Sequence, residues 1–226
     1  MQTETETETA PRAPTALAMA DTLEEDIVLG LLAPRVRLVE DELMERFDAK
    51  RHVVRDALAL LEGFGLIERR RNIGALVRSF SREEVIHLYE MRELLEVEAM
   101  RRIALPMAGA ALRQLHAVQA QHDAAIAEQN PRGIFRANQE FHRLLFAQCG
   151  NAYLSQAIED FARRTHAIRF GALMSRERQL QSQREHHDLL ALLSRGERQH
   201  LIDLTVAHLV PPRDLYLDTQ QALLVR

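Results

Sequence analysis

The hydrophobic pattern of the chain changes near Ser81, and this change divides the sequence into two regions of different kinds. Residues 15–80 contain three short helical patterns and two strand-like runs, whereas the long patterns after Ser81 all have helical spacing. Ser81 and Glu84 form the Ser-x-x-Glu pattern of a capping box, which marks the start of a long helix. A chain of 226 residues is long enough for two cores. We therefore predict a mainly α-helical protein with domains at 15–80 and 81–226.

Residues 15–80 have the order helix, helix, helix, hairpin. The helices are expected at about 15–32, from Glu40 onward, and from Arg51 to Gly63. Strand-like runs follow at 66–69 and 75–78, with a turn between them. A short helix, a tight turn and a second helix form the layout that places a recognition helix in the major groove of DNA.

Cationic residues lie where such a fold contacts DNA. Lys50, Arg51, His52 and Arg55 stand at the start of the third helix, and Arg51 and Arg55 share one face of it. Arginine suits contacts with both guanine and phosphate. For any single arginine the alternative is a solvated charged face, and acidic residues outnumber basic ones in residues 15–80. The placement of the cations, rather than their number, favours DNA binding.

The second region is expected to form an all-α bundle. Helical patterns cover the stretch from Ser81 to about residue 105, then 107–129, 132–148, 151–173, 176–194 and 197–209. Pro211 and Pro212 are expected to break the chain before a last short helix. The sequence contains no glycine-rich phosphate loop and no Gly-x-Ser-x-Gly motif, which removes two common enzyme classes.

Four polar residues of the second region have side chains that bind metal ions. Asn138 and His142 are four residues apart, so a helix places them on one face, and His186 and His208 lie beside leucine-rich helical patterns. Three imidazoles and an amide that converge would hold a divalent ion and leave positions open for a ligand. Zinc and nickel both suit this set. An ion inside a bundle that is linked to a second, different domain favours a sensor.

The bulk composition adds few constraints. The net charge of −4 argues against indiscriminate coating of nucleic acid, and the single cysteine, Cys149, excludes an intramolecular disulfide. No apolar run approaches the ~20 residues of a membrane span, and no signal peptide precedes the first helix. Residues 1–14 are polar, with alternating Thr and Glu, and are expected to be disordered. These features fit a cytoplasmic protein without a membrane partner.

Residues 38–70 closely resemble the winged helix-turn-helix of GntR-type bacterial transcription regulators. The family pattern joins Leu-Ser-Glu-x-x-Leu-Ala, Ser-Arg-Thr-Pro-Val-Arg-Glu-Ala-Leu and Leu-Glu-x-x-Gly-Leu-Val. The residues that match it are Arg51, Val54, Arg55, Ala57, Leu58, Leu61, Glu62, Gly65 and Leu66. The resemblance implies that Arg35, Arg51, His52 and Arg55 contact DNA and that Arg71, Asn72 and Gly74 belong to the wing. Lys50, His52 and Val53 depart from the pattern, so the operator sequence is expected to differ from the usual one.

Residues 81–209 resemble the all-helical FCD effector domain of the FadR-like subgroup of that family. The segment Asn138 to His142 matches its Asp-x-x-Phe-His motif, with Asn in place of Asp. The Glu-His-x-x-Leu motif selects His186 over His187, and the interval from Gly196 selects His208 over His200. The resemblance implies a divalent metal held by Asn138, His142, His186 and His208, beside a pocket for a small organic acid.

A neutral ligand set has a consequence for the effector. Three neutral histidines and an amide leave the charge of the ion uncancelled, which favours a carboxylate ligand but weakens the hold on the metal. Arg92, which matches the Arg-x-x-Leu-Glu signature, is expected to bind that carboxylate, although an ion pair with Glu96 is the alternative. Further pocket candidates are Arg136, His166 and Arg169. Core or surface roles are expected for five other histidines: His87, His116, His122, His187 and His200.

The sequence thus predicts a homodimeric, one-component transcription regulator, and the resemblance favours a repressor, the more common type in that family. Its operator affinity would depend on a metal and a small carboxylate. Two alternatives remain open: a regulator whose metal is purely structural or that has no small-molecule effector, and a metal-dependent hydrolase or lyase, since three histidines around zinc can activate water. Glu140 and Glu185 lie next to ligand positions, but neither occupies a motif position for a general base.

Overall fold

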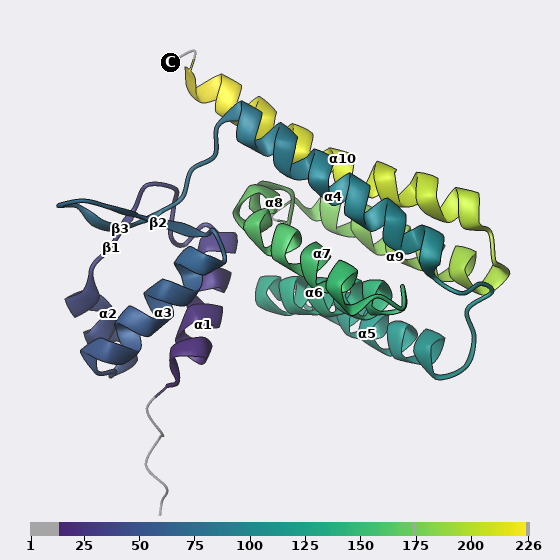
Figure 1. The fold of residues 1–226 in the computed structure, drawn as a ribbon, viewed down its shortest axis with the longest axis horizontal. Helices are drawn as coiled ribbons and strands as arrows, with labels where there is room; N and C mark the ends of the chain where they lie inside the picture. The colour runs from purple at the N-terminus through teal and green to yellow at the C-terminus, as the bar shows by residue number, and fades with distance from the viewer. Residues whose placement is uncertain (1–13, 174, 225–226) are drawn as a thin grey trace, which may run out of the picture.

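A computed structural model describes residues 14–173 and 175–224, which form a small N-terminal unit beside a longer helical bundle. Figure 1 shows the N-terminal unit at the left and the bundle at the right, joined by the segment that enters helix α4. The predicted disordered tail lies outside the described residues, except for Pro14. Among the described helices, none combines the length and the apolar composition that crossing a bilayer requires.

The N-terminal unit is a winged helix-turn-helix, as predicted. Its elements are α1 (Ala16–Val28), β1 (Arg37–Leu38), α2 (Glu40–Phe47), α3 (Arg51–Gly63), β2 (Ile67–Arg70) and β3 (Gly74–Val77). The strands pair antiparallel in the order β1-β3-β2, with Ile67 opposite Val77 and Leu38 opposite Ala75. Helix α3 buries its apolar side, including Val54 and Leu58, against α1 and α2. The two-residue strand β1 was not predicted, because a pair of residues carries no periodicity.

Helix α1 ends four residues earlier than predicted. Gly30 adopts a left-handed conformation with φ 69°, its N–H bonds to Ile27 O at 3.1 Å, and the N–H of Leu31 bonds to Asp26 O at 2.8 Å. These two bonds form a Schellman motif, which stops a helix before Pro34 is reached. Leu31 is consequently 67% exposed rather than part of the core.

The remaining helices form the bundle: α4 (Arg82–Arg102), α5 (Gly109–Ala127), α6 (Pro131–Ala147), α7 (Ala152–Arg164), α8 (His166–Leu173), α9 (Arg176–Arg195) and α10 (Arg198–Leu224). Helices α4 and α10 lie side by side, and α5 packs on α6 and α9 (Figure 1). The main core contains Phe141, Leu145, Leu189 and Leu193, all less than 3% exposed. Phe141 and Leu145 lie within three residues of His142, and Leu189 lies three residues after His186, so the core fixes the backbone that carries these two ligands.

Two predictions about the bundle were wrong. The stretch 151–173 is divided at Thr165, whose hydroxyl donates to Ala162 O at 2.8 Å and separates α7 from α8. The predicted break at Pro211 and Pro212 does not occur, because α10 continues through both prolines. Proline cannot donate to the helix, but α10 packs against α4, α8 and α9, and such tertiary packing supplies most of the stability of a helix in a protein.

The predicted capping box at the start of α4 is present. The hydroxyl of Ser81 accepts a hydrogen bond from the Glu84 N–H at 3.2 Å, and Glu84 Oε2 accepts one from the Ser81 N–H at 2.8 Å. We expect Ser81→Ala to lower the free energy of unfolding by about 1 kcal/mol. Urea unfolding measures this change. The control Ser194→Ala, at an exposed serine of α9 that caps no helix, should change it by less than about 0.5 kcal/mol.

Candidate metal centre, effector cavity and DNA-binding face

The structure brings three of the predicted metal ligands together. His142 on α6, His186 on α9 and His208 on α10 have ligand nitrogens that all lie within 4.8 Å of one another. The ring centroids form a nearly regular triangle, with distances of 5.1 Å (142–186), 5.2 Å (142–208) and 5.4 Å (186–208). The fourth predicted ligand, Asn138, lies one turn before His142 and lines a small cavity together with His208. Helices α6, α9 and α10 thus converge on one centre.

Unpaired polar atoms at this centre fit a metal ion. Among the described residues, both ring nitrogens of His142, Nε2 of His186 and both amide atoms of Asn138 are buried without a hydrogen-bond partner. An unpaired buried polar group costs roughly 1–3 kcal/mol, so this many in one place call for a ligand. Imidazole nitrogen and amide oxygen are suitable donors for a divalent transition metal. The residues present therefore fit the ion that the sequence predicts.

Two further residues orient the histidines. Gln119 on α5 places Oε1 at 2.9 Å from His186 Nδ1, and Glu185 places Oε2 at 2.5 Å from His208 Nδ1. If each acceptor binds an Nδ1–H, both rings direct the lone pair of Nε2 toward the centre. Sequence reasoning missed Gln119, because a glutamine on a distant helix carries no motif signal.

Burial favours the neutral form of His142, His186 and His122. It lowers the pKa of His142 and of His186 well below the usual value, and the neighbouring histidines lower both further. Burial also lowers the pKa of His122 to about 4. His122, for which a core or a surface role was expected, is buried: its ring centroid lies 5.1 Å from that of His186, and the ring contacts Gln119. Neutral imidazole is the form that binds metals, so the environment favours the ligand state of the ring.

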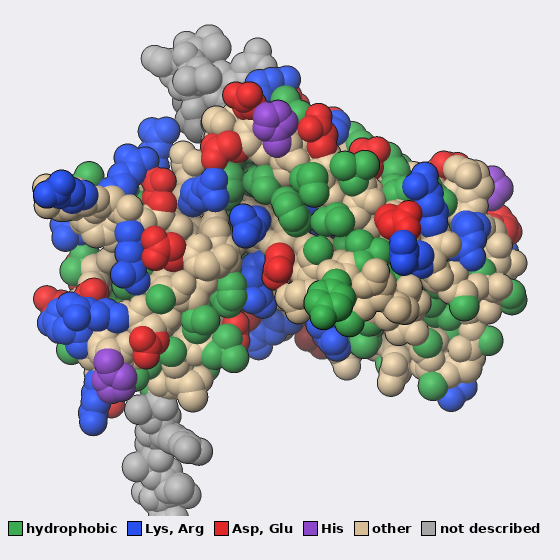
Figure 2. Space-filling model, viewed as in Figure 1, with side chains coloured by type: hydrophobic (Ala, Val, Ile, Leu, Met, Phe, Trp, Pro, Cys, Tyr) green, Lys and Arg blue, Asp and Glu red, His purple; other side chains and the backbone are tan. Residues whose placement is uncertain are grey.

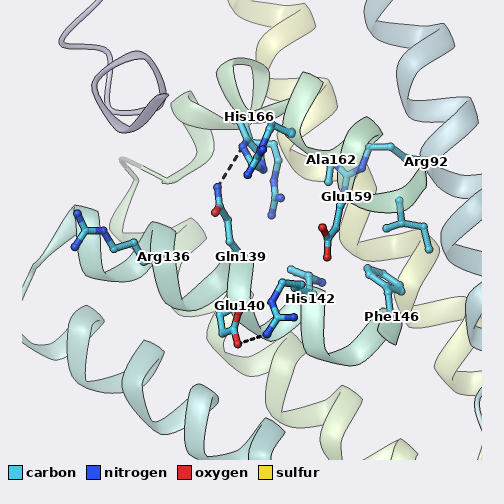
Figure 3. A pocket seen from close by; sticks show the side chains of 13 residues that line it. Arg92, Arg136, Gln139, Glu140, His142, Phe146, Glu159, Ala162 and His166 are labelled. Atoms are coloured by element: carbon cyan, nitrogen blue, oxygen red, sulfur yellow. Dashed lines mark hydrogen bonds and ion pairs between the residues drawn. The ribbon is translucent and has the colours of Figure 1, made fainter. Parts of the chain in front are cut away.

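A cavity of about 190 Å³ opens beside His142. It is lined by all four predicted effector residues, Arg92, Arg136, His166 and Arg169. In Figure 3, Arg92 and Arg136 lie on opposite sides of this cavity, with His142 between them. Glu159 of α7 also lines it, so the wall is not purely cationic.

The four candidate residues differ in what they already contact. Arg92 is buried and paired with Glu96, with Nη2 at 2.8 Å from Oε1, which is the alternative considered for it. Arg136 pairs with Glu25 and His166 with Glu24, both on α1. The guanidinium of Arg169 has neither a hydrogen bond nor an ion pair within the part of the chain that the structure describes, whereas its backbone N–H bonds to Thr165 O at 3.0 Å. Burial, together with the nearby Arg92, lowers the pKa of Arg169 to about 10, because both disfavour its charged form. A bound anion would stabilise that charge.

The predicted DNA contacts lie on one exposed part of the winged helix-turn-helix. Lys50, Arg51, His52 and Arg55 are exposed at the start of α3, and Arg35 is exposed before β1. The exposed wing tip contains Arg71, Asn72 with φ 64° and Gly74 with φ 100°. Figure 2 shows Lys and Arg side chains gathered at the left-hand edge of the molecule, over the wing and over α2 and α3.

The arginines at the start of α3 form ion pairs with acidic residues of α2. Arg51 Nη2 lies at 2.6 Å from Asp41 and Nη1 at 3.1 Å from Glu40, while Arg55 Nε lies at 3.1 Å from Glu40. These exposed pairs are worth little individually in water. Contact with phosphate or guanine would therefore require these arginines to exchange carboxylate partners for DNA.

Comparisons with known proteins identify both parts of the chain. Residues 15–77 match the model for bacterial regulatory proteins of the gntR family, and residues 87–210 match the FCD domain. The chain is 30% identical over 167 residues to the HTH-type transcriptional repressor RspR of Escherichia coli (strain K12), which covers 73% of this chain and 72% of that protein.

Solved structures share the fold. A GntR regulator from Rhodococcus sp. RHA1 superposes with a TM-score of 0.75 at 20% identity, covering 90% of this chain and 97% of its own. Escherichia coli McbR/YncC gives a TM-score of 0.74 at 15% identity, covering 92% and 100%. The hydrolase or lyase alternative is excluded by the family matches, since these define a transcription regulator. The chain belongs to the GntR family of bacterial transcription regulators and carries the FCD domain of its FadR-like subgroup.

Proposed function

We propose that this regulator is a homodimeric repressor whose operator affinity is changed by a small organic acid bound beside a divalent metal. The observation that carries the proposal is the cluster of His142, His186 and His208, in which His142 and His186 have unpaired buried nitrogens. The cluster adjoins a cavity lined by Arg169, whose guanidinium has no partner among the described residues. The name of the relative RspR, a repressor, supports the direction of regulation.

The metal ligands would be Asn138, His142, His186 and His208. When bound, the ion would supply a positive centre that attracts an anion. Gln119 and Glu185 would hold the rings of His186 and His208 in the binding orientation. Because none of the four ligands carries a negative charge, the attraction for an anionic effector is stronger than it would be with an aspartate at position 138.

We assign Arg169 as the residue that binds the carboxylate of the effector. This residue lines both the cavity beside His142 and the smaller cavity that contains Asn138 and His208. Arg92 is a weaker candidate than the sequence suggests, because Glu96 already neutralises it. A guanidinium without a carboxylate partner, close to the proposed ion, favours an acid over a neutral molecule.

The DNA contacts are assigned to Arg35, Lys50, Arg51, His52 and Arg55, and to the wing residues Arg71, Asn72 and Gly74. One α3 helix reads one half-site, so a two-fold homodimer would match a palindromic operator. The domain limits that we propose are 15–80 for this unit and 81–226 for the effector domain.

A purely structural metal is the second candidate. Three separate helices of the main core converge on the histidines, so an ion there would also stabilise the bundle. The two functions differ in the effect of metal removal: a structural site predicts melting of the bundle without any acid-dependent DNA release.

The first test is selection of DNA from a random duplex pool by the metal-loaded chain, followed by a screen of carboxylic acids for release. Enrichment of a palindrome and release by an acid are expected. If acids bind to the protein but none of them changes its affinity for DNA, the sensor proposal is contradicted. Regulation requires the acid to bind the DNA-binding conformation and the released conformation with different affinities.

The Arg169→Gln variant should weaken binding of such an acid by at least about 10-fold, since hydrogen bonds to charged groups contribute roughly 1.5–3 kcal/mol. Calorimetry on the wild type and the variant measures this change. The control is Arg195→Gln, an arginine at the end of α9 outside the cavity, which should leave the affinity unchanged. Equal affinities for the wild type and Arg169→Gln would assign the carboxylate to another residue.

A further inference from the structure

We propose that the effector carries two anionic groups, and that its outer group competes with Glu24 and Glu25 of α1 for one set of cationic side chains. This inference rests on the proposed function, because it concerns the same cavity. It adds the chemical class of the effector and the contact through which the cavity is coupled to the DNA-binding domain.

Helix α1 presents three consecutive carboxylates to the effector domain. Glu24, Glu25 and Asp26 are 3%, 5% and 1% exposed, although all three are acidic. Carboxylates are rarely buried unless cations pair with them, because removing the charge from water is costly. The partners of these residues therefore decide how the two domains are held together.

Arginines of the effector domain supply most of these partners, although Asp26 also pairs with Arg46 of α2 at 2.5 Å. Glu25 pairs with Arg132 at 2.5 Å and with Arg136, whose Nη2 donates to Oε2 at 3.0 Å. Asp26 also pairs with Arg132, at 2.6 Å. The contacts with Arg132 and Arg136 join α1 to the first two turns of α6, so charge rather than apolar packing dominates this part of the interface.

Glu24 extends the interface to α7 and α8. Its Oε1 lies at 2.6 Å from His166 Nδ1, and its Oε2 lies at 3.7 Å from Arg163 Nε. Gln139 of α6 approaches the same His166 nitrogen at 3.2 Å, as the dashed line in Figure 3 shows.

Two of these arginines, Arg136 and Arg163, also line the effector cavity, whereas Arg132 does not. Arg136, Gln139 and Arg163 line both that cavity and a second one whose opposite wall contains Glu24 and Glu25. His166 lines the effector cavity while it contacts Glu24. These residues therefore face α1 on one side and the effector cavity on the other, and an anion on the cavity side meets cations that Glu24 and Glu25 already occupy.

The charge distribution indicates the class of effector. The inner end of the cavity is defined by His142, whose ring nitrogens are buried, and by Arg169, and these two residues suit one carboxylate. The outer end is defined by the shared arginines Arg136 and Arg163, which are 68% and 37% exposed. An acid with a single carboxylate can bind at the inner end and leave α1 in place. An acid with a second anionic group reaches the outer end and draws cations away from Glu24 and Glu25. By linkage, the same competition lowers the affinity for the effector whenever α1 is docked.

The test uses the full, metal-loaded chain and two probes of equal carbon number, succinate with two carboxylates and butyrate with one. The variant is Glu25→Gln. The control is Glu98→Gln, which removes a carboxylate of α4 that pairs with Arg102 of the same helix at 2.6 Å and does not line the cavity. Calorimetry measures the ratio of succinate affinity to butyrate affinity in each protein.

Spin labels measure the position of α1. Cysteines introduced at Leu31 and Tyr153, which are 67% and 91% exposed, place one label on each domain, while the native Cys149 is buried. Pulsed electron resonance then gives the distance between the labels, with labelled chains diluted by unlabelled chains so that only distances within one chain are read.

We expect Glu25→Gln to raise the ratio of succinate to butyrate affinity on the order of 10-fold, the usual size of a coupling between sites. The control Glu98→Gln should leave this ratio unchanged. Succinate, but not butyrate, should shift the distance between the labels in the wild type. An unchanged ratio in Glu25→Gln, or succinate binding without a shift, would overturn the inference.

Two further outcomes are decisive. If Glu25→Gln does not fold, Glu24→Gln is used in its place, because it removes only the partner of Arg163 and His166. The ratio of succinate to butyrate affinity then tests the inference in the same way. If succinate binds to none of the proteins, the two-anion class is wrong. Metal content and operator selection test the proposed function by themselves, so that result would leave the sensor proposal standing.

Discussion

The His142→Ala variant is expected to purify without the divalent ion that the wild type should contain at about one equivalent per chain. Alanine removes the one ligand of the cluster whose two ring nitrogens are both buried and unpaired, and it leaves three donors on a neutral site. Metal analysis of the two proteins checks this. The wild type should also lose several kcal/mol of stability when a chelator removes the ion, since a ligand present at 1,000 times its Kd contributes about 4.1 kcal/mol.

The control for this experiment is His187→Ala. His187 is adjacent to His186 in sequence, but its ring is half-exposed and pairs with Asp123 at 3.0 Å, outside the cluster. This variant should keep the ion. A wild type that contains no metal would contradict the proposed ligand set, and Asn138→Asp would then be the informative variant, because a carboxylate at position 138 adds the charge that the site lacks.

The second large effect concerns DNA. The Arg55→Ala variant should bind the selected operator about 10- to 100-fold more weakly, because one arginine contact to a base contributes roughly 1–3 kcal/mol of discrimination. Arg55 is 61% exposed on the outer face of α3, while Val54 and Leu58 of the same helix are buried, so the fold should survive the change. A binding titration at fixed salt concentration measures the loss.

Glu40→Gln provides a contrasting variant. Glu40 holds both Arg51 and Arg55 in the free protein, so removal of its charge should tighten operator binding. An exposed arginine of the effector domain, Arg102, serves as the control, and Arg102→Ala should leave the affinity unchanged. If Arg55→Ala and Arg102→Ala weaken binding equally, α3 does not read the operator.

Features determined by nearby residues could be predicted from the sequence. The limits of α3, the capping box at Ser81 and the turn near Asn72 depend on residues a few positions apart, and they appear where the sequence places them. The continuation of α10 through Pro211 and Pro212 could not be predicted, because packing against three other helices outweighs the local preference of proline.

In the candidate site, too, some features could be predicted from the sequence and others could not. The helical spacing of Asn138 and His142 and the motif positions of His186 and His208 indicated one centre, and the three histidines do lie together. The partners of the cationic residues could not be predicted. Glu25 and Arg136 are 111 positions apart, so no local sequence pattern indicates that a carboxylate of α1 pairs with Arg136, which was predicted to contact the effector.

The buried carboxylates of α1 have a consequence for module exchange. A chimera that joins this effector domain to another DNA-binding module would keep Arg132, Arg136 and Arg163 but lose the carboxylates that oppose them, unless the new first helix carried acids at the same three positions. The two halves of this regulator therefore form a matched set. Transplanting either half means transplanting the opposing charges as well.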